Sequence, residues 1–401
     1  MRTSPATLAP LPGRAVGGGG APMDAGRDEG LLDALRRRRD RIVSDPRFQR
    51  FASAFLLTRP IARARSRELF DLCAGFVYSQ VLFACVATGL LRRLLERPQT
   101  CAELAAAMEI PPERLERLVA AAASLGLLER RGGGRFGLGM SGAALLGNPG
   151  VEAMIRHHAA LYADLCDPVA LLRAPQAATR LGAFWGYARA ERPADLPAES
   201  VAAYTRLMGE SQQFIAEIVL AAHDFRRHRR LLDVGGGNGT FALAAARAAP
   251  GLQVGVFDLP AVAAQARARF AEQGLSARAS AWEGDFLRDP LPRGADLVTI
   301  VRVLHDHEDP AVRTLLAAVR QAMKPGDQLL VAEPMADSFG ANPMADAYFG
   351  MYLMAMGSGR ARSFSELREL LHEAGFGSVR ARRSHNPLLA SVLVATPVKN
   401  Y

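Results

Sequence analysis

Residues 226–401 alternate between short apolar runs and longer segments of mixed polarity, and this pattern predicts strands separated by helices. The runs that predict strands lie at residues 230–232, 253–257, 277–283, 296–304, 329–332, 376–382 and 388–395. The run at 296–304 is apolar enough to be buried on both faces, as strands of a parallel sheet are. Strands and helices in this order are typical of a doubly wound, Rossmann-like α/β domain.

A glycine-rich turn, DVGGGNGT at residues 233–240, joins the first strand to an alanine-rich helix at 241–249. Glycine accepts positive φ and lets a ligand approach the backbone amides at a helix N-terminus. The chain has only two lysines, Lys324 and Lys399, and neither follows a glycine loop, which excludes a Walker-type phosphate site. Residues 237–242 fit the G-x-G-x-x-A pattern of dinucleotide sites, but a lone match is weak, so a nicotinamide oxidoreductase stays an alternative.

Carboxylates and an aromatic residue follow the next two strands. Asp258 ends the second strand, where an acidic side chain suits the two hydroxyls of a ribose. Asp285 and Phe286 follow the third strand and offer a carboxylate for an exocyclic amine and an aromatic face for a purine. Ligands of open α/β sheets bind at the carboxyl ends of the strands. We therefore expect His305 and Asp306, after the fourth strand, to lie beside a cofactor that contains adenosine.

Four of these segments together resemble the S-adenosylmethionine-dependent small-molecule O-methyltransferases of the caffeate and acetylserotonin type, over roughly residues 68–397. The segments are LDVGGGNG at 232–239, FDLP at 257–260, GDF at 284–286 and RVLHD at 302–306. The resemblance implies S-adenosylmethionine as the cofactor, with contacts from Gly235, Gly237, Asp258, Asp285, Phe286 and Arg302. It also implies that His305 is the general base and that no metal is required.

The expected chemistry needs one base and good positioning. Methyl transfer from a sulfonium is an in-line displacement, so the protein aligns oxygen, methyl and sulfur and removes the hydroxyl proton. Holding the reacting atoms near attack distance supplies about 7 to 11 kcal/mol. A positioned histidine adds roughly 10²- to 10⁴-fold, and its ordinary pKa of about 6.5 leaves it mostly neutral at cytoplasmic pH.

In the resembling family, two carboxylates orient the base. Glu333, at the end of the next strand, corresponds to one of them. The other usually stands in a Gly-Gly-x-Glu-Arg-Thr segment, which corresponds here to residues 357–363, and Ala361 replaces its glutamate. Two interpretations remain open. Either Asp306 or Asp346 substitutes for the missing carboxylate, or the acceptor needs a different polarisation because it is not a phenol.

By the same resemblance, a mostly helical segment at 147–225 and a methionine-rich helix at 346–356 enclose a small apolar hydroxylated acceptor. Core packing is the alternative role for the candidate acceptor contacts, which are Trp185, Met208, Met351 and Met354. A second resemblance, to bacterial carotenoid methylases, is carried by segments 57–63, 69–82 and 154–158. It implies transfer to the tertiary 1-hydroxyl of an acyclic carotenoid, with another hydroxylated or phenolic metabolite as the alternative.

Two competing interpretations concern metals and DNA. The run HDHED at 305–309 contains residue types that bind zinc or iron, but residues 308–310 look more like a helix start with acids in its first turn. Residues 100–140 follow the order helix, turn, helix, wing, with a capping box at Thr100. The second helix has few side chains that could read bases, and in the resembling family this module is a dimerisation domain. We expect a homodimer that binds no nucleic acid, with a cofactor-sensing transcriptional regulator as the competing class.

The chain has 401 residues, of which 49% are hydrophobic, enough for a large core and more than one domain. The predicted parts are a disordered tail at 1–30, a mostly helical winged-helix dimerisation domain at 31–146, a helical linker and acceptor-binding segment at 147–225, and the methyltransferase domain at 226–401. No apolar run reaches the length of about 20 residues that spans a bilayer, and the tail lacks the apolar region of a secretory signal. The four cysteines show no C-x-x-C spacing, so we expect reduced core thiols in a cytoplasmic protein.

The balance of charge is basic. The net charge is 49 − 40 = +9, and arginines crowd residues 36–67. A basic stretch favours anionic surfaces. Two interpretations remain open: peripheral contact with the anionic cytoplasmic face of a membrane, and a solvated helix face.

Overall fold

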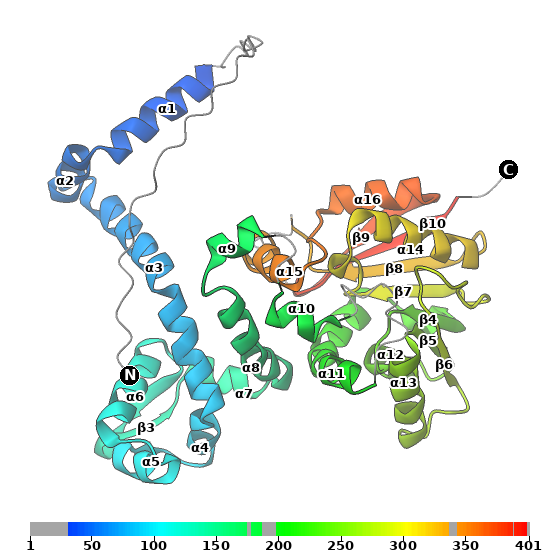
Figure 1. Ribbon diagram of the computed structural model, residues 1–401, viewed down its shortest axis with the longest axis horizontal. Coiled ribbons are helices and arrows are strands. Elements are labelled where there is room, and N and C mark those ends of the chain that lie inside the picture. The colour runs from blue at the N-terminus through cyan, green and yellow to red at the C-terminus, as the bar shows by residue number, and fades with distance from the viewer. Residues whose placement is uncertain (1–30, 175–177, 187–197, 337–342, 388, 399–401) are drawn as a thin grey trace. The chain divides into compact units, whose positions relative to one another are not determined.

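A computed structural model describes residues 31–398 except 175–177, 187–197, 337–342 and 388 (Figure 1). The predicted disordered tail lies outside these residues. The chain divides into two compact units, residues 1–76 and 77–401. This division falls inside helix α3 (Arg59–Ala87). It does not coincide with the predicted boundaries after residues 146 and 225, and those boundaries stay predictions.

The first unit consists of α1 (Leu31–Ser44), α2 (Pro46–Ala54) and the first part of α3. Asp45 caps α2, because its carboxylate accepts a hydrogen bond from the backbone N–H of Arg47 at 2.7 Å. No residue of α2 is buried. Large apolar side chains are exposed along all three helices and the turn between α2 and α3, among them Leu32, Leu35, Phe51, Leu57 and Ile61.

By length and composition alone, α3 is able to cross a membrane, so the expectation that no segment reaches this length was wrong. Only 11% of its apolar window is buried in the structure. A single helix of this kind is weak evidence for a membrane span.

The second unit begins with a winged-helix module. After α4 (Leu90–Glu96) come β1 (Gln99–Thr100), α5 (Cys101–Met108), α6 (Pro112–Ser124), β2 (Leu128–Arg131) and β3 (Arg135–Leu138). The strands form an antiparallel sheet in the order β1-β3-β2. The predicted capping box is present, since Thr100 and Glu103 exchange hydrogen bonds at the start of α5. The module has its own core, which includes Leu90, Leu91, Leu104, Leu115 and Val119.

Five helices lead from this module to the large sheet: α7 (Met140–Leu146), α8 (Pro149–Asp164), α9 (Pro168–Arg173), α10 (Arg180–Phe184) and α11 (Ala198–Ala222). Of these, α8, α9, α10 and α11 share a hydrophobic cluster with α15 (Gly350–Met356). Residues far apart in the sequence therefore enclose one region.

The large sheet has seven strands in the order β6-β5-β4-β7-β8-β10-β9. They are β4 (Arg230–Val234), β5 (Gln253–Asp258), β6 (Ala279–Glu283), β7 (Leu297–Val301), β8 (Gln328–Glu333), β9 (Phe376–Arg382) and β10 (Ser391–Pro397). The first five run parallel, and β10 is antiparallel to both of its neighbours. One face packs against α11, α12 (Thr240–Ala248) and α13 (Pro260–Glu272), and the other against α14 (Asp309–Ala322) and α16 (Phe364–Glu373) (Figure 1). The predicted doubly wound fold is confirmed.

Three details differ from the sequence-based expectation. Strand β7 ends at Val301 because Arg302 adopts a left-handed φ of 57°, which an extended strand does not accommodate. A 3-10 turn, η5 (Leu304–Asp306), follows. The predicted methionine-rich helix is a π-helix, η6 (Pro343–Phe349), continued by α15.

The expectation of four core thiols was wrong. Only Cys85 is buried, and burial raises the pKa of its thiol to about 11. Cys101 is half-buried, and Cys73 and Cys166 are exposed.

Candidate active site

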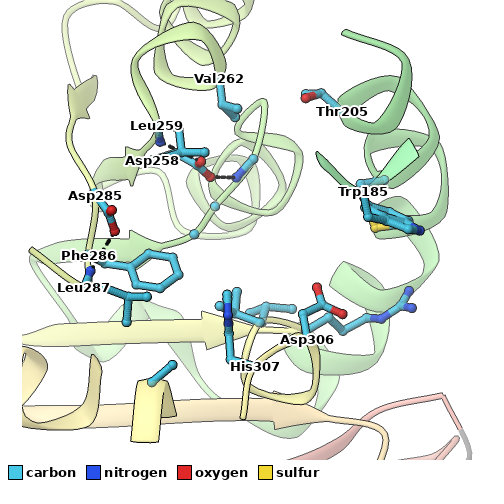
Figure 2. A pocket seen from close by; sticks show the side chains of 18 of the residues that line it. Trp185, Thr205, Asp258, Leu259, Val262, Asp285, Phe286, Leu287, Asp306 and His307 are labelled. Atoms are coloured by element: carbon cyan, nitrogen blue, oxygen red, sulfur yellow. Dashed lines mark hydrogen bonds between the residues drawn. The ribbon is translucent and has the colours of Figure 1, made fainter. Parts of the chain in front are cut away.

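A cavity of about 410 Å³ opens at the carboxyl ends of β4, β5 and β7, within the size range of small-molecule sites. Figure 2 shows Asp258, Asp285 and Phe286 on one side of it, Trp185 and Thr205 on the opposite side, and Asp306 and His307 below them. All six predicted cofactor contacts line the wall, namely Gly235, Gly237, Asp258, Asp285, Phe286 and Arg302.

The glycine turn and Asp258 form the first part of the wall. Asp258 accepts backbone hydrogen bonds from Gly237 and Leu259, both at 2.8 Å. Burial raises the pKa of Asp258 to about 6, although these two bonds favour the ionised form. A Cβ at Gly235 would lie 2.8 Å from a Val303 methyl carbon, so only glycine leaves this part of the cavity open.

Asp285 and Phe286 form the next part. Asp285 is 6% exposed, and its Oδ1 accepts a hydrogen bond from the backbone N–H of Leu287 at 2.9 Å. The ring of Phe286 meets His307 edge to face, with 5.5 Å between the centroids. This leaves a flat apolar surface beside a carboxylate, which suits a purine with an exocyclic amine.

The predicted base stands on η5 and is held by the end of β8. His305 Nδ1 lies 2.6 Å from Glu333 Oε2. The other oxygen of the same carboxylate accepts backbone hydrogen bonds from Val303 at 2.9 Å and Leu304 at 2.7 Å. Glu333 is 2% exposed, so its charge is buried and satisfied by three donors. The proton on Nδ1 is thereby fixed, and Nε2 is the nitrogen available for chemistry.

Nε2 of His305 faces Asp306 Oδ1 at 3.3 Å. Asp306 lines the cavity, whereas His305 is 6% exposed and lies behind that wall, with Phe349 against its ring at 5.8 Å. Burial alone would lower the pKa of His305, but Asp306 and Glu333 together raise it above its ordinary value. Asp346, the other candidate for the missing second carboxylate, is exposed on η6.

The alternative metal site has no support in this geometry. Within residues 31–398, wherever the structure describes them, no group of three or more His, Cys, Asp or Glu side chains could hold a metal ion. His305 is engaged by Glu333, and Asp309 by Arg362.

Arg302 presents an unusual cation to the cavity. Its backbone is left-handed, and its side-chain Nε is buried without a hydrogen-bond partner among the described residues. Since such a donor costs about 1–3 kcal/mol when it stays unpaired, it favours a ligand with an acceptor atom at this position.

Two of the four predicted acceptor contacts lie in the cavity wall. Trp185 and Met208 line it, but Met351 and Met354 are half-buried on α15 and do not. Trp185 also belongs to a buried polar network, because its indole N–H donates to the Tyr352 hydroxyl at 2.8 Å. The same hydroxyl lies 2.8 Å from His157 Nε2.

Several residues of this region were not predicted from the sequence, among them two on α11 and two in the segment after α15. Thr205 and Gln212 on α11 line the cavity, and Ser358 and Arg362 bond to the η5 turn and the residue after it. The spacing of Gln212, four residues after Met208, could have indicated a shared helix face. Arg362 follows Ala361 and so stands at the arginine of the family's Gly-Gly-x-Glu-Arg-Thr segment, but that correspondence does not indicate which groups its side chain contacts.

Comparison with known proteins agrees with this geometry. Residues 163–377 match the O-methyltransferase domain, and residues 70–147 match the O-methyltransferase dimerisation domain. The chain belongs to the O-methyltransferase family. It is 44% identical to demethylspheroidene O-methyltransferase of Cereibacter sphaeroides, over 88% of this chain and 93% of the relative. The Rhodobacter capsulatus protein of the same name is 38% identical, over 94% of this chain and 92% of the relative.

A solved structure of human N-acetylserotonin methyltransferase in complex with S-adenosylmethionine is similar as well, with a TM-score of 0.69, 26% identity, and 84% and 98% of the two chains covered. The methyltransferase uses S-adenosylmethionine. The residues here fit that cofactor, because Asp258 offers a carboxylate to ribose hydroxyls and the turn at Gly235 leaves room for it. The dimerisation domain supports a homodimer.

We predict that cofactor affinity falls as the pH drops below about 6. The carboxylate of Asp258 must be ionised to accept hydrogen bonds from both ribose hydroxyls, and its pKa of about 6 in the free protein means that it is protonated below that pH. Calorimetric titration of S-adenosylmethionine between pH 5 and pH 8 is the measurement. Asp258→Asn should bind more weakly at every pH and lose most of this dependence. A dependence of equal slope in that variant would contradict the role of Asp258.

Proposed function

We propose that this methyltransferase transfers a methyl group from S-adenosylmethionine to the tertiary 1-hydroxyl of an acyclic carotenoid of the demethylspheroidene type. The observation that carries the proposal is the 44% identity to a demethylspheroidene O-methyltransferase along nearly the whole of both chains. The relatives named acetylserotonin O-methyltransferase are at most 35% identical and align with 80% of this chain or less. The apolar side chains of Trp185, Met208 and Val262 in the wall support an apolar acceptor.

When bound, S-adenosylmethionine supplies an electrophilic methyl group on a sulfonium. The protein aligns the acceptor oxygen with that methyl group, and orientation of this kind is worth about 7 to 11 kcal/mol. His305 and Asp306 take up the hydroxyl proton as a pair, since Asp306 faces the cavity and lies 3.3 Å from Nε2 of the base. A tertiary alcohol is a weak acid, so its proton leaves late, while the new bond to carbon forms.

The glutamate that is missing at Ala361 fits this scheme. Glu333 holds Nδ1 and Asp306 lies at Nε2, so both nitrogens of the base already have a carboxylate beside them. We infer that Asp306 replaces the family's second carboxylate.

We predict that methyl-labelled S-adenosylmethionine transfers its label to a detergent-dispersed 1-hydroxy carotenoid and not to catechol-type phenols. His305→Ala should bind the cofactor normally and lose roughly 10²- to 10⁴-fold in turnover, the usual contribution of a positioned base. Label extracted into organic solvent is counted for both proteins. Label in the phenols alone would support O-methyl transfer and disprove the carotenoid as acceptor. Full turnover by His305→Ala would disprove the role of His305 as the base.

We predict that kcat/KM rises with pH and has its midpoint above 6.5, the ordinary pKa of histidine. The base acts only when it is neutral, and Asp306 and Glu333 favour its charged form. Asp306→Asn removes one of these charges, so its midpoint should move to lower pH. Initial rates from pH 5.5 to pH 9 measure both midpoints. A midpoint that stays in place would show that Asp306 does not act on the base.

We further propose that this cytoplasmic protein meets its acceptor at an anionic membrane surface, through the first unit. Residues 31–76 contain 11 arginines and 5 acidic residues, so they carry 11 − 5 = +6 of the net charge of +9. Exposed apolar side chains such as Phe51 and Leu57 stand among these arginines. Residues 31–69 precede both family domains, so the matched dimerisation domain does not account for their apolar surface. A basic amphipathic segment of this kind suits an interfacial lipid layer.

We predict that the protein floats with vesicles of phosphatidylcholine and phosphatidylglycerol, and much less with phosphatidylcholine alone. Arg38→Gln with Arg41→Gln should weaken this binding by about 2 kcal/mol, or roughly 30-fold, at about 1 kcal/mol for each arginine near the surface. Arg226→Gln with Arg227→Gln, which removes two exposed arginines of the second unit, is the matched control. Equal losses in both double variants, or equal binding to neutral vesicles, would disprove the assignment to the first unit.

A further inference from the structure

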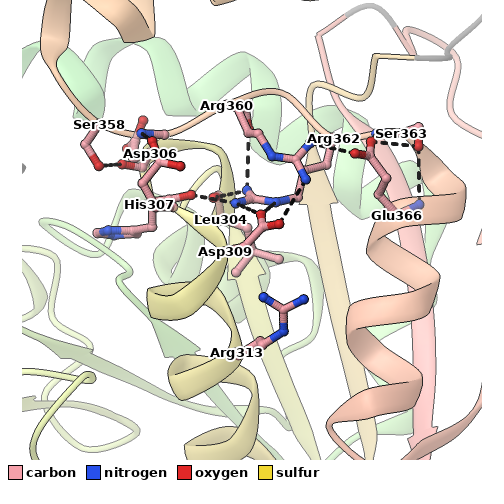
Figure 3. Close-up of polar contacts among 12 residues, drawn as sticks. Leu304, Asp306, His307, Asp309, Arg313, Ser358, Arg360, Arg362, Ser363 and Glu366 are labelled. Carbon is pink, nitrogen blue, oxygen red and sulfur yellow. Dashed lines mark hydrogen bonds and ion pairs between the residues drawn. The ribbon is translucent and has the colours of Figure 1, made fainter. Parts of the chain in front are cut away.

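The η5 turn is held from two sides, and Glu333 holds the first of them. On the second side lies Arg362, whose side chain is 1% exposed. Its guanidinium donates to the backbone carbonyl of Leu304 at 2.7 Å and to that of His307 at 2.7 Å (Figure 3). These two carbonyls stand immediately before His305 and immediately after Asp306. Arg362 therefore brackets the two residues that handle the proton.

The contacts of Arg362 complement those of Glu333. The carboxylate accepts from the N–H groups of Val303 and Leu304, and the guanidinium donates to the C=O groups of Leu304 and His307. A short 3-10 turn leaves most of its backbone groups without intrahelical partners, and within η5 the Leu304 carbonyl accepts only a long bond from the His307 N–H, at 3.3 Å. Here two buried side chains of opposite charge satisfy them, and the turn cannot shift without breaking bonds on one side or the other.

A buried cation must itself be compensated. Asp309 Oδ1 accepts from Nε and Nη2 of Arg362, at 2.9 and 2.7 Å. The planar guanidinium thus donates to three groups at once, namely Asp309 and the carbonyls of Leu304 and His307. The ammonium group of a lysine cannot reproduce this geometry. Asp309 starts α14, so the same guanidinium also connects the turn to the helix that follows it.

The segment that carries Arg362 contacts the turn at two further points. The hydroxyl of Ser358 donates to the backbone carbonyl of Asp306 at 2.9 Å. A Cβ at Gly359 would lie only 2.1 Å from the carbonyl oxygen of His305, so the two backbones are in direct contact. Where the family places a glutamate beside the base, this chain thus has a segment that holds the backbone of the base.

We propose that Arg362 is a positioning residue for this reaction, which keeps His305 Nδ1 on Glu333 and Nε2 beside Asp306. It touches neither cofactor nor acceptor and acts through the backbone of the turn. The inference rests on the proposed role of His305 as the base. It predicts an effect on kcat and on the pH dependence of the reaction, and none on the binding of S-adenosylmethionine.

The test compares Arg362→Lys with Arg360→Lys. Arg360 lies two residues away and pairs with Asp309 and Glu366, but its side chain makes no contact with the turn. Arg362→Lys keeps the charge and should lose roughly 10- to 100-fold in kcat, as expected for a small displacement of reacting groups. Its cofactor Kd should stay within about twofold, and its pH midpoint should fall toward the ordinary value of histidine because the base moves away from its carboxylates. Arg360→Lys should match the unmodified protein in all three quantities.

A milder variant keeps the test decisive if Arg362→Lys is poorly folded by circular dichroism. Ser358→Ala removes one hydrogen bond to Asp306 and should lower kcat by a few-fold. The proposal is overturned if Arg362→Lys retains normal kcat and pH midpoint, or if kcat falls only in proportion to the folded fraction. His305→Ala distinguishes the two proposals. Full activity in His305→Ala would disprove the role of His305 as the base. An inactive His305→Ala beside a normal Arg362→Lys would disprove only the positioning role of Arg362.

Discussion

The carboxylate of Glu333 determines where the catalytic turn of this methyltransferase lies. A buried charge is tolerated only when it is hydrogen-bonded, and here the donors are two backbone N–H groups and one imidazole of the same turn. Glu333 itself stands at the end of β8, in the middle of a seven-stranded sheet. The rigidity of the sheet is thereby transmitted to a histidine that belongs to a loop. The left-handed Arg302 is part of the same arrangement. It ends β7 at Val301, and the backbone N–H groups of the next two residues, Val303 and Leu304, donate to Glu333.

The two halves of the site are built in different ways. The cofactor half consists of residues at the ends of neighbouring parallel strands, which a doubly wound sheet always brings to one edge. The acceptor half combines α8, α10, α11 and α15. The indole N–H of Trp185 donates to the Tyr352 hydroxyl, which also lies within hydrogen-bond distance of His157 Nε2. Burial lowers the pKa of His157 to about 4, so this imidazole is neutral near pH 7. A neutral, apolar enclosure of this kind suits an acceptor with a single hydroxyl.

Two buried charges of opposite sign lie beside the turn. The side chains of Glu333 and Arg362 are both buried from solvent. Each is compensated by a different group, namely Glu333 by His305, the proposed base, and Arg362 by Asp309 at the start of α14, so the two charges do not pair with each other. Substituting Glu333 would leave three donors of the turn without their acceptor, and breaking a buried pair of this kind costs several kcal/mol in general. Substituting Arg362 would remove its bonds to Leu304 and His307, while Asp309 would keep its ion pair with Arg360. The arrangement gives a geometric reason why this chain functions with Ala361 where its family has glutamate.

The sequence by itself determined the sheet, the glycine turn and the two carboxylates of the cofactor half, because strand ends and turns are encoded by neighbouring residues. The pairing of His305 with Glu333, which are 28 positions apart, was expected only from the resemblance to the family. The strand predicted at 296–304 extends past the observed end of β7 at Val301, because no local sequence pattern indicates that Arg302 is left-handed. Only the tertiary structure decided that Arg362 holds the turn and that Trp185 and His157 meet at Tyr352. These contacts join residues 58, 167 and 195 positions apart. Their partners are chosen by how helices and loops pack on the finished sheet, and no periodicity along the chain records that packing.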